Sequence, residues 1–325
     1  MPSCDSVDSK NNIYMRRALQ LARNGEGRVS PNPMVGAVIV ADNRIIGEGF
    51  HAYYGGPHAE VNAIRSVKPQ DLPLLKDSTI YVTLEPCAHH GKTPPCANLI
   101  VETGIPRVVV GAPDPNPLVA GKGVEILRKA GVEVEEGVLI DECREINKRF
   151  MKAQTSPLPH ITLKWAQSSD GYMTAIDEDG HPLPVKFSSP LSSVWVHRGR
   201  ANTDAILVGA GTEATDHPRL TTRLWGGNSP QKFVAGQEAK ENLILWLNKL
   251  RERGITSLIV EGGPTLLESF ISQGLYDEIR IETSPVSIGK GLSSPSLPKD
   301  LCLSDSFSCR GNNVVFYKPK DVKKA

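Results

Sequence analysis

Residues 78–103, STIYVTLEPCAHHGKTPPCANLIVET, carry the pattern that decides the fold of the first half of the chain. The opening STIYVTLE alternates apolar and polar side chains, which predicts a β-strand. The closing CANLIVET predicts a short helix, because the Gly104 that follows it is a common helix stop. Cys87 lies just after the predicted strand, and Cys96 begins the predicted helix. The stretch therefore predicts a strand, a loop and a helix, with a cysteine at each end of the loop.

A histidine and a glutamate upstream suggest a metal site around these cysteines. The segment HAEVNAIRSV predicts a helix that opens at His58. Together, His58, Cys87 and Cys96 supply the nitrogen and sulfur ligands that zinc prefers, and a catalytic zinc site leaves one position to water. A helix N-terminus favours the thiolate that binds metal. Glu60 can take a proton from a metal-bound water and return it to a leaving amine. The ordered set favours a metal site over unrelated core cysteines and a surface histidine.

The remaining segments of the first half alternate between helix and strand patterns. We expect a helix that ends at Gly25 and a hairpin around the turn Asp42–Asn43. A buried strand at 107–112 and a further helix and strand across 123–139 follow. A hairpin followed by βα units predicts a three-layer α/β/α sandwich.

A second α/β series begins after a break in the pattern. Ser156-Pro157 and Leu158-Pro159 are typical of a linker. Strand-like and helix-like segments then resume with ITLKWAQSSDG, TDAILVGAG, SLIVEGGPTLLESFISQG and DEIRIETSPV. We therefore predict a first domain at 1–150, a linker at 151–159 and a second α/β domain at 160–325.

Composition excludes several classes of protein. Hydrophobic residues make up 39% and charged residues 22% of the 325 residues, which is ordinary for a globular protein. The net charge of +1 gives no basic field for nucleic acid, and no apolar run is long enough for a membrane span. We therefore expect no nucleic-acid or membrane partner. Six cysteines are few for a chain of this length and suit a reducing compartment, so we expect a cytoplasmic protein.

Two glycine-rich turns in the second half are candidate phosphate sites. VGAGTEA, residues 208–214, imitates a dinucleotide fingerprint, but Pro218 follows too early for a long helix. It also comes too late in the domain to be its first βα turn. EGGP is the better candidate, because a strand leads into Gly262-Gly263 and Pro264 suits the first helical position. Backbone N–H groups at that helix start can hold a pyrophosphate.

The metal motif departs from one signature and resembles another family. Zinc deaminases of nucleobases carry His-x-Glu and Pro-Cys-x-x-Cys, whereas eight residues separate Cys87 from Cys96. LEPCAHHGKTPPC, with PNPMVGAVIV and DPNPLVAGKG, closely resembles the deaminase half of the bifunctional riboflavin biosynthesis proteins. SSDGYMT, HRGRANTDAILVGAGTEATDHPRLTTR and VEGGPTLLESFI resemble the reductase half of the same family. The resemblance implies a cytidine-deaminase-like first domain and a dihydrofolate-reductase-like second domain.

For the first domain, the resemblance implies zinc on His58, Cys87 and Cys96, with Glu60 as the proton shuttle. It implies that Asn32 lies near the substrate pyrimidine and that His89 and His90 line the loop without binding the metal. The implied reaction is hydrolytic loss of ammonia from 2,5-diamino-6-(5-phosphoribosylamino)pyrimidin-4-one.

For the second domain, the resemblance implies reduction of the ribosyl side chain to ribityl by NADPH. Guanidinium groups suit the ribose phosphate of such a substrate. The implied NADPH contacts are Ala166, Lys186, Thr212, Asp216, Gly263, Pro264, Thr265, Leu266, Leu267, Glu268 and Ser269. The implied substrate contacts are Pro184, Arg200, Leu220, Arg223 and Glu261.

The chain is shorter than this family's pattern between about 224 and 254. Only KFVAG is strand-like there, and a helix is expected from Leu243 to Arg253. A missing strand would impair the NADPH site, so a deaminase whose second domain only assembles subunits is an alternative. A nucleic-acid deaminase and a structural zinc protein are further alternatives. The family resemblance implies a homo-oligomer.

Overall fold

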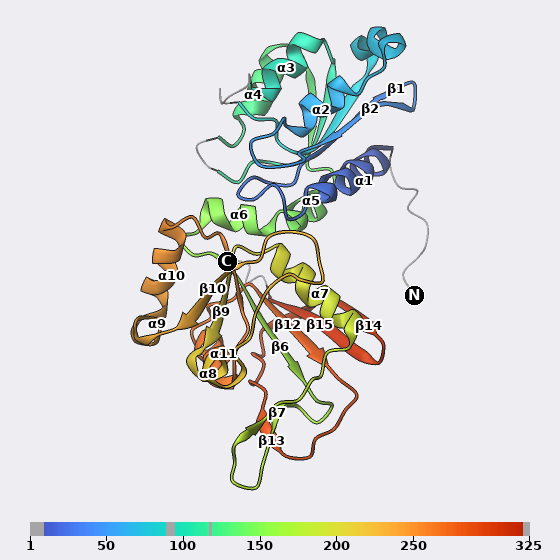
Figure 1. Cartoon of the computed structure of the whole chain (residues 1–325). Helices are drawn as coiled ribbons and strands as arrows, with labels where there is room; N and C mark the ends of the chain where they lie inside the picture. Colours follow the sequence, from blue (N-terminus) through green and yellow to red (C-terminus); the bar gives the residue numbers. More distant parts are fainter. Residues whose placement is uncertain (1–9, 89–94, 117–118, 321–325) are drawn as a thin grey trace. The chain divides into compact units, whose positions relative to one another are not determined.

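The computed structural model separates into two compact units, Met1–Thr155 and Ser156–Ala325 (Figure 1). It describes residues 10–88, 95–116 and 119–320. None of the helices in these ranges combines the length and apolarity that a membrane span requires.

Unit 1 is built on a five-stranded sheet in the order β2-β1-β3-β4-β5. The β1–β2 hairpin turns through Asp42 and Asn43, both with positive φ, which suits the twist of paired strands. Strand β3 runs antiparallel to β1, and β4 and β5 run parallel to β3. The strands are β1 (Gly36–Ala41), β2 (Arg44–Phe50), β3 (Thr79–Leu84), β4 (Arg107–Ala112) and β5 (Glu133–Glu136).

Helices cover both faces of this sheet. Along β1, Ala37 and Ile39 pack with α2, α3 and α4, whereas Val38 and Val40 pack with α1 and α5. This alternation is the period of two that a strand buried on both faces requires, and it confirms the predicted three layers. The helices are α1 (Lys10–Ala22), η1 (Arg23–Gly25), α2 (Ala59–Arg65), η2 (Pro69–Asp77), α3 (Cys96–Thr103), α4 (Lys122–Lys129), α5 (Ile140–Ile146) and α6 (Lys148–Thr155).

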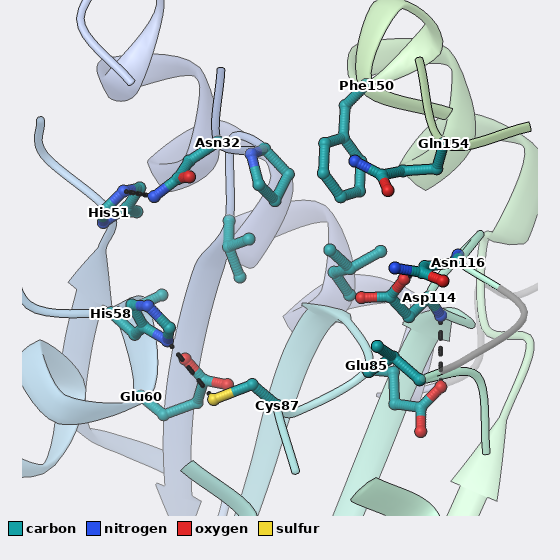
Figure 2. A pocket seen from close by; sticks show the side chains of 15 residues that line it. Asn32, His51, His58, Glu60, Glu85, Cys87, Asp114, Asn116, Phe150 and Gln154 are labelled. Atoms are coloured by element: carbon teal, nitrogen blue, oxygen red, sulfur yellow. Dashed lines mark hydrogen bonds between the residues drawn. The ribbon is translucent and has the colours of Figure 1, made fainter. Parts of the chain in front are cut away.

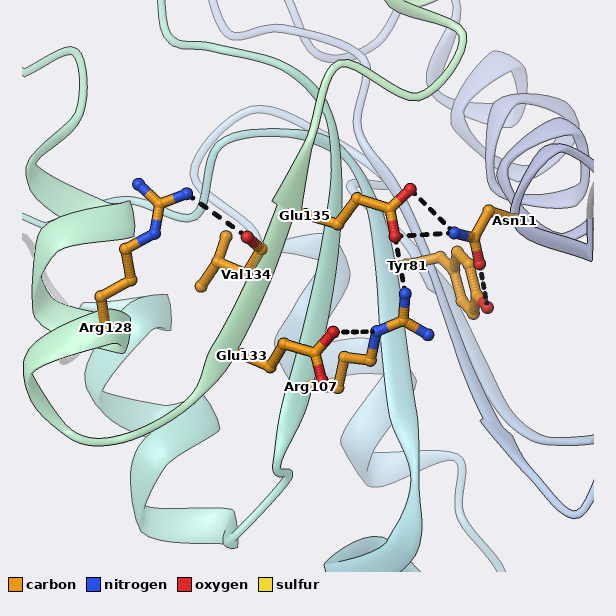
Figure 3. A network of polar contacts seen from close by, with 7 residues as sticks. All are labelled: Asn11, Tyr81, Arg107, Arg128, Glu133, Val134 and Glu135. Atoms are coloured by element: carbon orange, nitrogen blue, oxygen red, sulfur yellow. Dashed lines mark hydrogen bonds and ion pairs between the residues drawn. The ribbon is translucent and has the colours of Figure 1, made fainter.

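A polar network ties the first helix to the edge of this sheet (Figure 3). Arg107 pairs with Glu133 at 3.1 Å and with Glu135 at 2.6 Å. The Glu135 carboxylate also accepts two hydrogen bonds from the Asn11 amide, at 2.8 and 2.9 Å. The Tyr81 hydroxyl donates to the oxygen of the same amide at 3.0 Å. The network thus connects α1 with β3, β4 and β5.

Unit 2 is built on a seven-stranded sheet in the order β10-β9-β11-β6-β12-β15-β14. The first five strands in this order are parallel, and β15 and β14 complete the sheet in antiparallel pairing. A small sheet, β13-β7-β8, lies outside it. The strands are β6 (His160–Gln167), β7 (Tyr172–Ile176), β8 (Pro182–Leu183), β9 (Ala205–Gly209), β10 (Gln231–Ala235), β11 (Ser257–Val260), β12 (Glu278–Thr283), β13 (Gly291–Ser293), β14 (Leu301–Cys309) and β15 (Asn312–Pro319).

Helices α10 and α11 pack their apolar faces against one side of the large sheet and form the main core of unit 2 with it. This core includes Leu207, Leu247, Leu258 and Phe270, all of them buried. The helices are α7 (Pro190–Ala201), α8 (Ala210–Asp216), α9 (Gln237–Glu241), α10 (Leu243–Glu252) and α11 (Pro264–Ser272).

One segment differs from the sequence-based expectations, and another agrees with them. Helix α6 occupies 151–155, the first part of the predicted linker, because Phe150 and Met151 pack against the core of unit 1. The shortened segment keeps its strand: β10 contains KFVA and pairs with β9 over five residues. The gap that a lost strand would leave is therefore absent from the described sheet.

Candidate functional site

The predicted metal ligands of unit 1 converge at the ends of three elements. His58 directly precedes α2, Cys87 follows β3, and Cys96 is the first residue of α3. The His58 Nδ1 atom lies 3.6 Å from the Cys87 sulfur and 3.3 Å from the Cys96 sulfur. One ligand atom from each residue lies within 4.8 Å of the others. Three donors at this spacing can share one ion.

The chemistry of this donor set fits zinc. The Cys96 backbone N–H, at the start of α3, donates to the Cys87 sulfur at 3.3 Å. The Cys96 thiol and this N–H lower the pKa of Cys87, while the same contact with Cys87 raises the pKa of Cys96. The set therefore already favours one thiolate, and two sulfurs with one imidazole are ligands that zinc prefers. No fourth residue among those that the structure describes joins the group. His89 and His90 lie outside the described residues.

Glu60 lies beside this donor set in a buried position. It is in the first turn of α2, and only 3% of its surface is exposed. Burial, followed by the negative charge of Cys87, raises its pKa to about 7. A carboxyl group with this pKa can both accept and release a proton near neutral pH.

A pocket of about 280 Å³ opens beside the donor set (Figure 2). The predicted substrate residue Asn32 lines it, and its amide nitrogen lies 3.1 Å from Nε2 of His51. The pocket also contains His58, Glu60 and Cys87. The structure thus brings three of the predicted residues, His58, Glu60 and Cys87, together with Asn32 at one cavity. Cys96 belongs to the same donor set but does not line the pocket.

Glu85 anchors the loop on the other side of the pocket. Its carboxylate accepts hydrogen bonds from the backbone N–H groups of Asp114, Gly121, Gly123 and Val124, at 3.0 to 3.4 Å. Gly123 is needed there, because a Cβ atom would lie 1.9 Å from the Pro86 carbonyl oxygen. Glu85 therefore fixes the segment that precedes α4 against the strand that leads to Cys87.

Sequence reasoning missed several residues of this pocket. DPNP contains Asp114 and Asn116, and its Asp-Pro-Asn pattern marks a turn but no role. Phe150 and Gln154 line the pocket from α6, which the sequence did not separate from a linker. His51 follows a strand with no local signal at all. These side chains reach the pocket only through tertiary folding.

In unit 2, the predicted residues Arg200 and Glu261 form a buried ion pair. The two nitrogens Nε and Nη2 of Arg200 donate to the two carboxylate oxygens at 3.0 and 2.9 Å. Lys164 Nζ lies 3.5 Å from the same carboxylate. Burial alone would raise the pKa of Glu261, but Lys164 and Arg200 lower it to about 2. Lys164 was missed, although a lysine inside an otherwise apolar strand pattern was a visible signal.

The predicted NADPH residues gather at the carboxyl ends of the parallel strands. Because β9 and β11 are neighbours, the turn at Gly209 and the turn at Gly262-Gly263 meet there. A Cβ atom on Gly263 would lie 4.0 Å from the Thr212 hydroxyl. Gly263 caps α11, whose first residue is Pro264. Ala166 lies at the same end of β6, the strand next to β11.

The other predicted site residues of unit 2 do not form one cluster with these. Pro184, Lys186 and Arg223 are exposed. Leu220 is buried against Ile206, Val208 and Ile259. Asp216 ends α8, and its side chain lies outside the described part. The short α8 does begin at the VGAG turn, and it ends before His217.

Two family models match the two units of the chain. The cytidine and deoxycytidylate deaminase zinc-binding region matches residues 8–112. The RibD C-terminal domain matches residues 159–245 and 242–305. These matches agree with a cytidine-deaminase-like first unit and a reductase-like second unit.

Similar proteins cover most of the chain. The riboflavin biosynthesis protein RibD of Aquifex aeolicus is 39% identical over 86% of this chain and 88% of its own length. RibD of Escherichia coli is 33% identical over 89% of this chain and 93% of its own length. One similar crystal structure is a diaminohydroxyphosphoribosylaminopyrimidine deaminase/5-amino-6-(5-phosphoribosylamino)uracil reductase from Thermotoga maritima. It is 36% identical, with a TM-score of 0.85, and the match covers 95% of this chain and 99% of that one. The structure of RibD from Acinetobacter baumannii is 30% identical, with a TM-score of 0.82, and the match covers 96% of this chain and 99% of that one.

Proposed function

The chain belongs to the family of RibD riboflavin biosynthesis proteins, and we propose that its two units act in turn on one pyrimidine ribotide. Members of this family are bifunctional, zinc-dependent deaminases and NADPH-dependent reductases, and so is this protein. The first substrate is 2,5-diamino-6-(5-phosphoribosylamino)pyrimidin-4-one, and deamination gives 5-amino-6-(5-phosphoribosylamino)uracil. Reduction of its ribosyl side chain gives the ribityl product. The observation that carries this proposal is a His-Cys-Cys donor set beside a buried glutamate in one pocket.

In unit 1, His58, Cys87 and Cys96 hold the zinc ion. When bound, zinc would supply an acidified water as the nucleophile near neutral pH. Glu60 would accept a proton from the attacking water and return it to the departing amine. Its burial and its raised pKa of about 7 support this assignment, because both proton transfers need a group that titrates near the working pH. Asn32 holds the pyrimidine.

In unit 2, the carboxyl edge of the parallel sheet holds NADPH and the ribotide. We assign Gly263 to Ser269, the N-cap and first turns of α11, to the cofactor phosphates together with Ala166, Lys186, Thr212 and Asp216. The backbone donors there are the N–H groups ahead of Leu267, because Pro264 has none and that of Leu267 donates to the Gly263 carbonyl. Helix N-termini favour phosphate through their free N–H groups and their dipole. Arg200 and Glu261 contact the substrate together with Pro184, Leu220 and Arg223. Their buried ion pair supports a fixed polar site there.

The binding partner is a small molecule, with no nucleic acid and no membrane. We further propose a cytoplasmic location and a homo-oligomer. The free thiols of Cys143, Cys302 and Cys309 support a reducing compartment. The domain bounds 1–150, 151–159 and 160–325 belong to the same proposal.

A coupled assay tests both activities at once. Purified protein is given the diamino ribotide, zinc and NADPH, and ammonia release and NADPH oxidation are followed together. Both signals are expected. Ammonia without NADPH oxidation would support the alternative in which the second unit only assembles subunits. The retained strand β10 argues against that alternative. Absence of both signals would sink the proposal.

A further inference from the structure

His51 is a buried pocket residue that the proposed proton transfer does not use. It directly follows β2, and 3% of its surface is exposed. Its ring lies edge-on to that of His58, with 5.6 Å between the ring centres. It stands outside the group of candidate metal ligands, which contains His58, Cys87 and Cys96. A polar ring in this position needs a reason other than metal binding.

The hydrogen bonds of His51 define which ring nitrogen carries the proton. Nδ1 lies 3.0 Å from the carbonyl oxygen of Pro57, which can only accept, so Nδ1 donates. In the neutral ring the other nitrogen, Nε2, is then an acceptor. It lies 3.1 Å from the Asn32 amide nitrogen, which therefore donates to it. Both nitrogens of His51 are engaged, so the ring has no polar atom left for the substrate.

This arrangement decides how Asn32 faces the pocket. A free asparagine amide can rotate by half a turn and offer either its oxygen or its nitrogen. Here the nitrogen points to His51 (Figure 2). No group among the described residues donates to the Asn32 oxygen, and Asn32 lines the pocket. The oxygen is the atom that remains for a ligand.

We propose that His51 is a positioning residue that fixes the Asn32 amide so that its oxygen accepts a hydrogen bond from an N–H group of the substrate pyrimidine. The pocket thereby selects rings that present a donor at this place and rejects rings that present an acceptor, because the latter would leave two acceptors facing each other. This inference rests on the proposed deaminase function of unit 1.

Two substitutions at His51 separate its two hydrogen bonds. In His51→Gln, the amide oxygen takes the place of Nε2 and can still accept from Asn32. In His51→Asn, the shorter amide takes the place of Nδ1, keeps the bond to Pro57 and loses Asn32. One lost hydrogen bond of about 1 to 1.5 kcal/mol corresponds to roughly tenfold in affinity. We expect H51N to raise KM for the ribotide about tenfold and H51Q less than about threefold, with kcat little changed in both.

A double-mutant cycle shows whether His51 acts through Asn32. Dissociation constants for the ribotide are measured by calorimetry in zinc-loaded Glu60→Gln protein, which should bind without turnover. H51N should weaken binding about tenfold when Asn32 is present and less than about twofold in an Asn32→Ala background. Zinc content is measured for each variant and should stay the same. His181→Asn, at an exposed histidine of unit 2, is the matched control and should bind like the parent.

The outcomes separate this inference from the function on which it rests. Wild-type ammonia release tests the deaminase function, and its absence overturns both. With an active wild type, unchanged affinity in H51N overturns the role of His51. An equal loss with and without Asn32, or a loss of zinc in H51N alone, shows a structural role and overturns it too. If H51N fails to fold, H51Q is the test: a tenfold loss of ribotide affinity in folded H51Q, which keeps the acceptor for Asn32, also overturns the role of His51.

Discussion

Glu60 in unit 1 and Glu261 in unit 2 are the same side chain in two opposite environments. Both are largely buried, so desolvation raises the pKa of each. Around Glu60 the largest effect of a neighbouring charge comes from Cys87, and the pKa of Glu60 rises to about 7. Around Glu261 the charges of Lys164 and Arg200 prevail, and its pKa falls to about 2. Burial alone therefore does not set the role: Glu60 is suited to move a proton, and Glu261 to remain a fixed anion.

Metal removal should separate the two units most sharply. A chelator that strips zinc should abolish ammonia release and leave NADPH oxidation unchanged when the deaminated ribotide is supplied. The reason is that, among the described residues, the His-Cys-Cys donor set lies in unit 1, whereas the other candidate group, Asp177, Asp179 and His181 of unit 2, is largely exposed and stands apart from the predicted reductase residues. Metal analysis should find about one zinc per chain before treatment, and added zinc should restore release. Persistent ammonia release from metal-free protein would contradict the site.

Glu60→Gln tests the proton-carrying half of the comparison. An amide cannot take up and return a proton, so ammonia release should fall by about 10² to 10⁴. Zinc content should not change, and neither should NADPH oxidation when the deaminated ribotide is supplied. The matched control is Glu102→Gln, an exposed residue of α3, which should behave like the wild type. Equal loss in both variants, or no loss in Glu60→Gln, would assign proton transfer to another group.

Acid unfolding tests the fixed-anion half. The folded pKa of Glu261, about 2, lies below the ordinary value of 4.5, so its contribution to stability is present above pH 4.5 and is lost as the pH falls towards 2. The shift corresponds to about 3 kcal/mol as an upper bound. Trp165, Trp195, Trp225 and Trp246 all lie in unit 2, so tryptophan fluorescence reports its unfolding alone.

Urea midpoints should therefore fall more steeply with acidification in the wild type than in Glu261→Gln. The variant lacks the carboxylate that is protonated, so it should lose this part of the slope. Parallel pH profiles of the two proteins would show that Glu261 is not held ionised.

Glu85→Gln tests a carboxylate whose role is purely structural. The amide keeps one acceptor oxygen, so the N–H groups held by the other oxygen lose their partner, at a cost of about 2 kcal/mol. Hydrogen exchange should quicken at one of two pairs of amides, Asp114 with Gly121 or Gly123 with Val124, according to which oxygen the amide nitrogen replaces, and stay unchanged in unit 2. Uniform protection in wild type and variant would mean that the loop is held by other contacts.

The smallest effect is expected at the network of Figure 3. Arg107→Ala removes ion pairs to Glu133 and Glu135 that are partly exposed to solvent. Such pairs contribute less than about 1 kcal/mol and weaken with salt. Differential exchange of β5 amides at low and high salt measures the effect. A loss above about 2 kcal/mol would show that Glu135 and Asn11 make the network cooperative.

The candidate sites differ in how much of each the sequence predicted. The metal ligands could be found because Cys87 and Cys96 mark the two ends of one strand–loop–helix unit and His58 opens a helix. In unit 2, Gly263 was recognised from its turn, whereas Lys164 was not recognised as a partner of Glu261. Lys164 lies on β6 and Glu261 directly follows the adjacent strand β11, which is far away in the sequence.

The sequence by itself determined the period of the strands, the positions of the turns and the identity of the metal-ligand set, since these depend on neighbouring residues. It also carried the resemblance that the related proteins bear out. Only the tertiary structure decided that α6 lines the pocket, that 231–235 completes a sheet, and that His51 holds Asn32. The physical reason is that these features depend on which distant segments pack together and on the charges that burial brings side by side.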